Sequence, residues 1–180
     1  GSCLNTYSEG ATLTIDGFTL TGGVGWQGAG GIIRGDTKLM NLMVTGNHAS
    51  SRGGGFVIHG GAILENVEIA GNTVSDEETG VGGGLYIEVL ENQDIATLDN
   101  VNIHNNQAAK GGGMYVQNSN VNISLTAFYS NISYTDGGGL HFHNSIGQIT
   151  KTSIMNNNAS TRGGGIYSST SSIHLDRVNL

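Results

Sequence analysis

Two carboxylates, Glu65 and Asp99, are the best candidates for chemistry in this sequence. Each stands four residues before an apolar residue, Ile69 or Ile103, that recurs at regular intervals along the chain. If the intervals are turns of a coil, the two carboxylates lie about 5 Å apart, the rise of one coil. Such a pair suits Ca²⁺ binding or acid–base attack on a glycosidic bond. The column that they share contains no Lys or Arg. We therefore expect a solvated face without catalytic residues, with a Ca²⁺ site as the alternative.

Four rings form a second candidate site. They stand at the second position after a glycine triplet and are Tyr86, Tyr115, His141 and Tyr167. In the first three cases the residues on both sides are apolar, so strand alternation places the rings on the outward face. An exposed aromatic stripe suits sugar-ring stacking or a protein partner. The alternative is that cross-strand aromatic pairs only stabilise the sheet.

Histidine ligation of a metal is a third possibility. His141 and His143 stand two residues apart, and strand alternation would point both outward. His59 lies three coils away, roughly 14 Å at the β spacing, so no third ligand is within reach. We expect no zinc site.

Glycine triplets recur along the chain every 26 to 29 residues. They begin at Gly53, Gly82, Gly111, Gly137 and Gly163, and an apolar residue follows each. A period of this length indicates a solenoid, in which each unit must stack on its neighbours to bury its apolar face. The middle glycines suit turn or close-contact positions where a Cβ would clash, and are Gly54, Gly83, Gly112, Gly138 and Gly164.

A second landmark precedes each triplet. It is an apolar residue followed three positions later by an asparagine, and these asparagines are Asn47, Asn72, Asn106, Asn131 and Asn157. We expect them to occupy a turn column in the left-handed αL conformation. We also expect their side-chain amides to hydrogen-bond from coil to coil.

Short strands are indicated inside each repeat. After the triplets, apolar and polar residues alternate, as in Leu85 to Glu88 and Met114 to Gln117. Leu64, Val67 and Ile69, with Leu98, Val101 and Ile103 one repeat later, form columns predicted to face the core. The spacing of three inside each set breaks the alternation, so the chain must bend there. Each repeat is thus predicted to contain two or three strands joined by tight turns.

The predicted fold is all-β, a right-handed parallel β-helix of about six to seven coils of 24–26 residues. Residues 1–180 form a single β-helix domain in this interpretation. One interval, from Ile69 to Ile103, is longer than the others. Its excess falls at the acidic run Asp76 to Glu78 and at Leu90 to Asp94, which we interpret as solvated loops, with a partner site as the alternative.

Composition excludes several classes of protein. The chain has 31 glycines and no proline, but the glycine period is not the three-residue period of collagen. A net charge of −7 without a Lys/Arg cluster argues against binding nucleic acid. No run of 18 apolar residues occurs, so no transmembrane segment is expected. Cys3 is the single cysteine, which excludes an internal disulfide. A cysteine at a mature N-terminus can also carry a lipid anchor in bacteria.

These repeats resemble those of the chlamydial polymorphic membrane proteins and related β-helix surface proteins. The resemblance rests on Phe128-Tyr129-Ser130-Asn131 and on Gly60 to Ile63, which reads Gly-Gly-Ala-Ile. It implies an extracellular or cell-surface, adhesin-like passenger domain. It implies no catalytic residue.

Two functional classes follow. The first is a non-enzymatic extracellular structural or adhesive protein whose partners are other surface proteins or copies of itself. The second is a carbohydrate-binding or polysaccharide-active β-helix that uses the tyrosine stripe and the acidic pair. Because Leu180 falls in mid-coil, the chain is either a segment of a longer solenoid or a subunit that stacks end to end into a filament. No cofactor is expected apart from the Ca²⁺ alternative.

Overall fold

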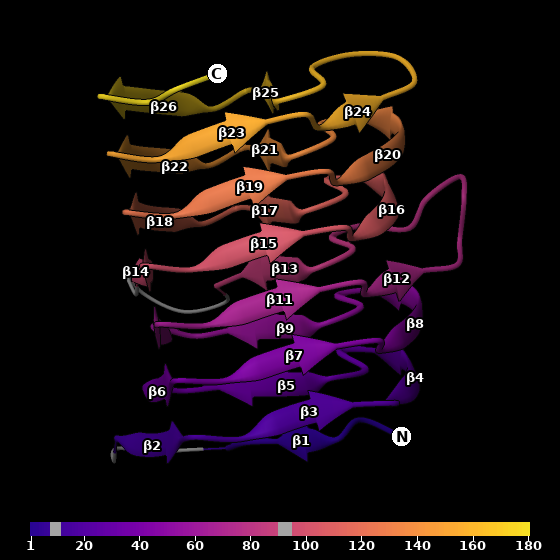
Figure 1. The fold of residues 1–180 in the computed structure, drawn as a ribbon, viewed down its shortest axis with the longest axis vertical. Helices are drawn as coiled ribbons and strands as arrows, with labels where there is room; N and C mark the ends of the chain where they lie inside the picture. Colours follow the sequence, from indigo (N-terminus) through magenta and orange to yellow (C-terminus); the bar gives the residue numbers. More distant parts are fainter. Residues whose placement is uncertain (8–11, 90–94) are drawn as a thin grey trace.

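The computed structural model describes residues 1–7, 12–89 and 95–180. These residues form parallel strands and turns, and no helix long and apolar enough to cross a membrane occurs among them. The strands stack along one axis as a β-solenoid of about six turns, and the two labelled termini lie at opposite ends of it (Figure 1). The chain climbs this axis with a right-handed sense (Figure 1). The predicted all-β parallel β-helix is confirmed.

Four parallel sheets run the length of the solenoid, and we call them sheets A to D. Sheet A contains β1 (Leu4–Asn5), β5 (Gly31–Arg34), β9 (Phe56–His59), β13 (Leu85–Glu88), β17 (Met114–Gln117), β21 (Leu140–His143) and β25 (Ile166–Ser169). Sheet B contains β2 (Leu13–Asp16), β6 (Thr37–Met40), β10 (Ile63–Glu65), β14 (Ile95–Asp99), β18 (Asn120–Ser124), β22 (Ile146–Thr150) and β26 (Ser172–Asp176). Sheet C contains β3 (Thr19–Thr21), β7 (Met43–Thr45), β11 (Glu68–Ala70), β15 (Asn102–His104), β19 (Ala127–Tyr129) and β23 (Ser153–Met155). Sheet D contains β4 (Val24–Gln27), β8 (His48–Arg52), β12 (Thr73–Val74), β16 (Gln107–Lys110), β20 (Ile132–Asp136) and β24 (Asn158–Ala159).

A complete coil therefore has four strands, and the prediction of two or three was wrong. The strand that the sequence did not indicate is the one in sheet D, between the asparagine and the glycine triplet. Its inward residues Ala49, Val74 and Ala108 are small, and they form a separate buried cluster with Ala29 of the turn between β4 and β5. Small residues are needed there because sheet D packs on the glycine backbone, and they give the segment little apolar periodicity for a sequence reading to detect.

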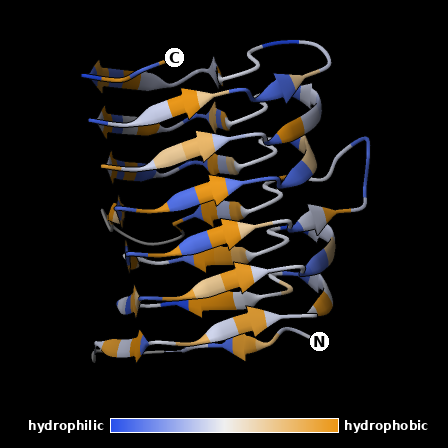
Figure 2. Ribbon diagram, in the orientation of Figure 1, coloured by the Kyte–Doolittle hydropathy of each residue, from blue (hydrophilic) through white to orange (hydrophobic). Residues whose placement is uncertain are grey.

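The main core lies between sheets A, B and C. Its side chains come from the inward columns that the sequence predicts, and Leu64, Ile69, Leu98 and Ile103 are all 0% exposed. Parallel register aligns these columns, since Ile69 pairs with Val44 on one side and with Ile103 on the other. Figure 2 shows the result as apolar segments that recur on successive strands. Stacking thus buries a face that a single coil cannot bury.

The longest interval carries one clear protrusion. The chain leaves sheet D after β12 and projects before returning to β13 (Figure 1). Asp76 organises this loop, because its carboxylate accepts backbone hydrogen bonds from Glu78 at 3.0 Å and Thr79 at 2.9 Å. Leu90 to Asp94, the second predicted loop, lies outside the described residues.

We expect Ile103→Ala to lower the free energy of unfolding by about 2–5 kcal/mol, the usual range for a large-to-small change in a core. Ile103 is fully buried and lies between Ile69 and Phe128 in the stack. Urea unfolding followed by circular dichroism measures the change. Ile63→Ala is the matched control, because Ile63 lies on the outer face of sheet B and is 41% exposed. Equal losses in the two variants would contradict the assigned register.

Candidate functional site

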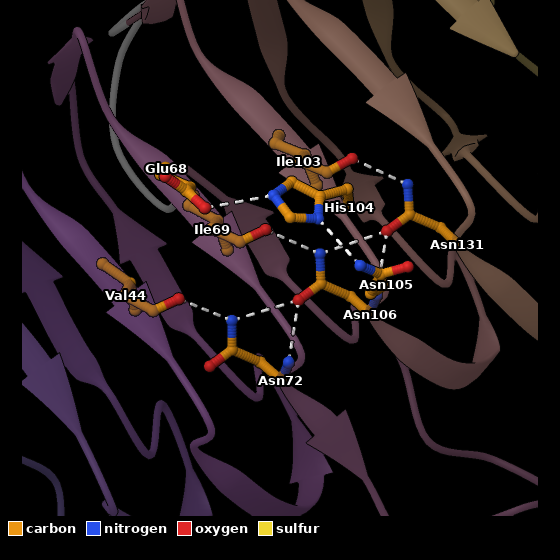
Figure 3. A network of polar contacts seen from close by, with 9 residues as sticks. All are labelled: Val44, Glu68, Ile69, Asn72, Ile103, His104, Asn105, Asn106 and Asn131. Carbon is orange, nitrogen blue, oxygen red and sulfur yellow. Dashed lines mark hydrogen bonds and ion pairs between the residues drawn. The ribbon is translucent and has the colours of Figure 1, made fainter.

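A ladder of buried asparagines runs along the axis at the corner between sheets C and D. The Asn72 amide nitrogen donates to Asn106 Oδ1 at 3.0 Å, and the Asn106 amide nitrogen donates to Asn131 Oδ1 at 3.1 Å (Figure 3). Each side chain also binds the backbone of the coil before it, as Asn106 does at the Ile69 carbonyl, 2.9 Å away. Asn47 and Asn157 extend the ladder at its two ends. The ladder therefore fastens each coil to the next.

The αL conformation at this corner does not belong to the ladder asparagines, contrary to the sequence prediction. The residue before each of them has positive φ, for example Gly71 at 62° and Asn105 at 55°. The ladder side chains must point inward, and the turn residue ahead of them supplies the sharp change of direction. Glycine and asparagine adopt αL at little cost, which explains why this neighbouring column contains mostly these two residues.

The glycine triplets serve two physical purposes. The first glycine of each triplet lies in the left-handed region, with φ of 67° at Gly82 and 60° at Gly111. The middle glycine is a close-contact position. A Cβ at Gly112 would lie 2.3 Å from the Ile132 carbonyl oxygen, and a Cβ at Gly83 would lie 2.6 Å from the Gln107 nitrogen. Sheet D is thus pressed directly against the triplets.

The expected exposed aromatic stripe is buried, which corrects the sequence interpretation. Tyr86, Tyr115 and His141 are only 2%, 7% and 4% exposed, and Tyr167 is partly buried. The rings do stack from coil to coil, with centroids 6.0 Å apart for Tyr86 and Tyr115 and 4.6 Å apart for Tyr115 and His141. Their faces are therefore occupied by one another, and the stripe offers no platform for a sugar ring.

A covering layer closes the aromatic stack from outside. It consists of the residues just before the triplets, which pair from coil to coil in the column Arg52, Val81, Lys110, Asp136 and Arg162. The Arg52 guanidinium lies 5.2 Å from the Tyr86 ring centroid, and that of Arg162 lies 4.5 Å from the Tyr167 centroid. Asp136 and Arg162 hold each other through two hydrogen bonds of 2.9 and 2.7 Å. Burial raises the pKa of Tyr86 and of Tyr115 as a consequence.

His141 makes the stability of this layer depend on pH. Burial lowers its pKa from 6.5 to about 4, although the Asp136 backbone and charge act in the opposite direction. Because the folded-state pKa lies below the unfolded value, the stabilisation is complete above pH 6.5 and is lost as the pH falls towards 4. Linkage gives a loss of about 3 kcal/mol by pH 4.

We expect the urea concentration at the midpoint of unfolding to be lower at pH 4.5 than at pH 7. The difference between the two pH values should be smaller in His141→Tyr than in the wild type. Tyrosine is the residue that stands above and below His141 in the stack, so the ring packing is retained while the titration is removed. His143→Tyr is the control, because His143 is exposed on the same strand. An identical pH profile in wild type and His141→Tyr would contradict the assignment.

The acidic pair lies where the sequence predicts, but each carboxylate has its own partner. Glu65 and Asp99 are register neighbours on β10 and β14. Glu65 forms an ion pair with Lys38 at 2.8 Å, while Asp99 accepts a hydrogen bond from Ser124 at 2.7 Å. In the described part of the chain, no group of three His, Cys, Asp or Glu side chains converges as a metal site. Among the residues that the structure describes, the Ca²⁺ alternative thus gains no third carboxylate.

A groove at the corner between sheets B and C is a feature that the sequence analysis missed. It has a volume of about 460 Å³ and is lined in part by Asn41, Asn66, Asn100 and Glu68. These asparagines form a second ladder, exposed to solvent, in which Asn100 donates to Asn66 at 2.7 Å and Asn66 donates to Asn41 at 3.3 Å. The signal was present, since an asparagine recurs three residues before the apolar landmark in these coils.

One wall of the groove continues into an aromatic pair. Glu68 accepts a hydrogen bond from the His104 ring at 3.2 Å, as Figure 3 shows. The His104 ring stacks on Tyr129 with centroids 4.5 Å apart and an interplanar angle of 8°. The outer surface of these coils therefore brings together amides, a carboxylate and an aromatic pair. No site is predicted there from the sequence.

Comparison with known families identifies one segment. Residues 151–169 match the Chlamydia polymorphic membrane protein repeat. The matched segment contains one copy of each landmark, namely Ile154, Asn157 and the triplet that begins at Gly163. The predicted resemblance to this family is confirmed, although both motifs on which it was based, Phe128 to Asn131 and Gly60 to Ile63, lie outside the matched residues. Searches of curated proteins and of solved structures found no match.

The landmarks of the repeat lie inside the solenoid and not on its outer surface. In the interior they form the core, the buried ladder and the glycine contacts. A repeat that specifies the interior leaves the outer faces free to differ from coil to coil. The matched repeat suggests a surface-type, adhesin-like β-helix.

Proposed function

We propose that this chain is a non-enzymatic β-helix of the cell surface or the extracellular space that adheres to other molecules through its outer faces. The observation that carries the proposal is the match of residues 151–169 to the Chlamydia polymorphic membrane protein repeat, together with a fold that repeats the same landmarks along its length. A rigid solenoid holds its surface residues in fixed columns, so it presents an extended binding surface at low entropic cost.

The absence of catalysis is part of this proposal. The supporting observation is that the acidic pair is engaged by neighbours, Glu65 by Lys38 and Asp99 by Ser124. A general acid needs a free position next to the scissile bond, and these contacts occupy both carboxylates. The test is an assay for reducing sugars released from plant and bacterial polysaccharides. Release by the intact chain that is lost in Glu65→Gln and Asp99→Asn would contradict the absence of catalysis.

Adhesion is tested directly with coated beads. Beads that carry the folded chain should attach to cultured animal cells several-fold more often than beads coated with albumin or with heat-unfolded chain. Attachment that does not exceed these controls would overturn the adhesive function. Surface location is tested separately, by antibody labelling of intact cells of the source organism before and after permeabilisation.

End-to-end self-association remains a prediction. Every coil pairs with the next in parallel register, so the edge of one coil is complementary to the edge of another. Light scattering over a range of protein concentrations measures the association. A constant monomer mass at high concentration would contradict a filament.

A further inference from the structure

We propose that the groove between sheets B and C binds an uncharged, linear glycan whose chain runs along the solenoid axis. This inference rests on the proposed adhesive function and assigns it a ligand class and a site. The groove is lined by residues of successive coils, so any ligand that follows it crosses the strands and meets a similar set of groups at each coil rise of about 4.8 Å.

The exposed asparagine ladder supplies the hydrogen bonds. A primary amide has two N–H donors and two acceptor lone pairs, and the ladder contact uses one of each. Asn66 donates one N–H to Asn41 and accepts one from Asn100, and these two ladder contacts leave its second N–H and its second lone pair unused. Sugar hydroxyl groups both donate and accept, which matches a row of groups with one free donor and one free acceptor each.

The walls of the groove determine the charge and shape of the ligand. Glu68 lies in the wall with 44% of its side chain exposed, and Asp16 binds the lower end of the ladder through Asn41 at 2.7 Å. These carboxylates, on a chain with a net charge of −7, disfavour a sulfated or sialylated chain. Met43 is 43% exposed and adds an apolar contact suited to the face of a sugar ring.

A peptide is the less suitable ligand for this groove. Extended peptides bind by adding a strand to an open sheet edge or by placing side chains in apolar pockets. The floor of this groove is a corner at which Asn41, Asn66 and Asn100 have φ of 51°, 56° and 54°. Its backbone turns there, so no straight edge is available for strand addition.

The second exposed ladder shows which groups distinguish the site. At the corner between sheets A and B, Asn144 donates to Asn118 at 2.9 Å, and these residues also have positive φ, 49° and 51°. Serine, threonine and asparagine dominate the hollow around them, whereas the groove between sheets B and C adds Glu68 and the adjoining stacked pair. The two ladders therefore provide a matched test and control.

The experiment compares glycine variants of the two ladders. Asn66→Gly combined with Asn100→Gly removes the amides while preserving positive φ, and Gly17 already occupies the same column with φ of 77°. The control is Asn118→Gly combined with Asn144→Gly. Each protein is screened on an array of cello-, manno- and chito-oligosaccharides, with heparin oligosaccharides as the anionic comparison, and affinities are then measured by calorimetry. Glu68→Gln provides a second test that leaves the ladder intact.

We expect the intact chain to bind at least one uncharged oligosaccharide, the groove variant to lose at least tenfold in affinity, and the control variant to stay within twofold. Binding of none of the uncharged oligosaccharides, binding of heparin alone, or equal losses in both double variants would overturn the proposal. Bead attachment to cells is measured in parallel. If the unmodified chain attaches to cells but binds no glycan, the groove is not a glycan site and the adhesive function still holds. If the unmodified chain does not attach to cells, the adhesive function itself is rejected.

Discussion

Asn106→Ala should lower the free energy of unfolding by about 3–5 kcal/mol, among the largest losses available to a single substitution in this chain. The side-chain Oδ1 of Asn106 accepts hydrogen bonds from the backbone and side-chain nitrogens of Asn72 at 2.9 and 3.0 Å. Its amide nitrogen donates to Ile69 and Asn131. Removing the side chain leaves buried polar groups on both neighbouring coils without partners, and each such group costs about 1–3 kcal/mol.

The measurement is equilibrium urea unfolding, with Asn122→Ala as the control. Asn122 is exposed on β18, so its loss should change stability by less than about 0.5 kcal/mol. Hydrogen exchange adds a local measure, because the Asn72 backbone N–H, which donates to Asn106 Oδ1, should lose protection in Asn106→Ala before the backbone N–H groups of sheet C do. A loss as small as that of the control would show that the ladder contributes little.

Gly112→Val is expected to prevent stable folding or to cost on the order of 4 kcal/mol, the range of severe backbone and packing conflicts. The new Cβ would lie 2.3 Å from the Ile132 carbonyl oxygen and 2.7 Å from that of Gly138. Both obstacles are backbone atoms held in stacked coils, so neither can move without separating sheet D from the triplets. Gly83→Val meets the same kind of obstacle one coil earlier.

Gly25→Val is the control for this prediction. Gly25 lies in β4 of the same sheet D, and a Cβ there would find its nearest neighbour at 3.6 Å, an ordinary contact. The soluble yield and the thermal midpoint of both variants are compared after identical expression. A Gly112→Val protein that is as soluble and as stable as Gly25→Val would refute the close-contact role of the triplets.

Stacking explains why the interior was largely readable from the sequence. Each inward column, such as Leu64 above Leu39 and below Leu98, meets its own equivalents in the next coils. The same residue type therefore recurs at the same spacing, and the period reveals both the register and the core. The inter-coil hydrogen bonds of the ladder asparagines follow from the same logic, because an amide stacked on an amide satisfies both partners.

Tertiary structure alone decided which outward faces are exposed. Alternation along β13 and β17 shows that Tyr86 and Tyr115 leave the main core, but it carries no information about a second layer. The residues just before the triplets supply that layer, since Arg52 lies over the Tyr86 ring and Val81 packs against the cluster that contains Tyr86 and Tyr115. Most residues of this covering column are charged, so the sequence pattern gives no sign that they bury the aromatic rings.

The exposed groove depends on tertiary structure for a different reason. Asn41, Asn66 and Asn100 are spaced like the buried ladder, and spacing does not distinguish an inward from an outward amide. The positive φ of the exposed ladder turns its side chains to solvent at the corner between sheets B and C, while the buried ladder follows its αL residue and points inward. The sequence thus determined the repeat, the register and the core, because those depend on identical neighbours. The folded backbone decided which outward side chains are exposed and which are covered, because that depends on contacts between segments of different sequence.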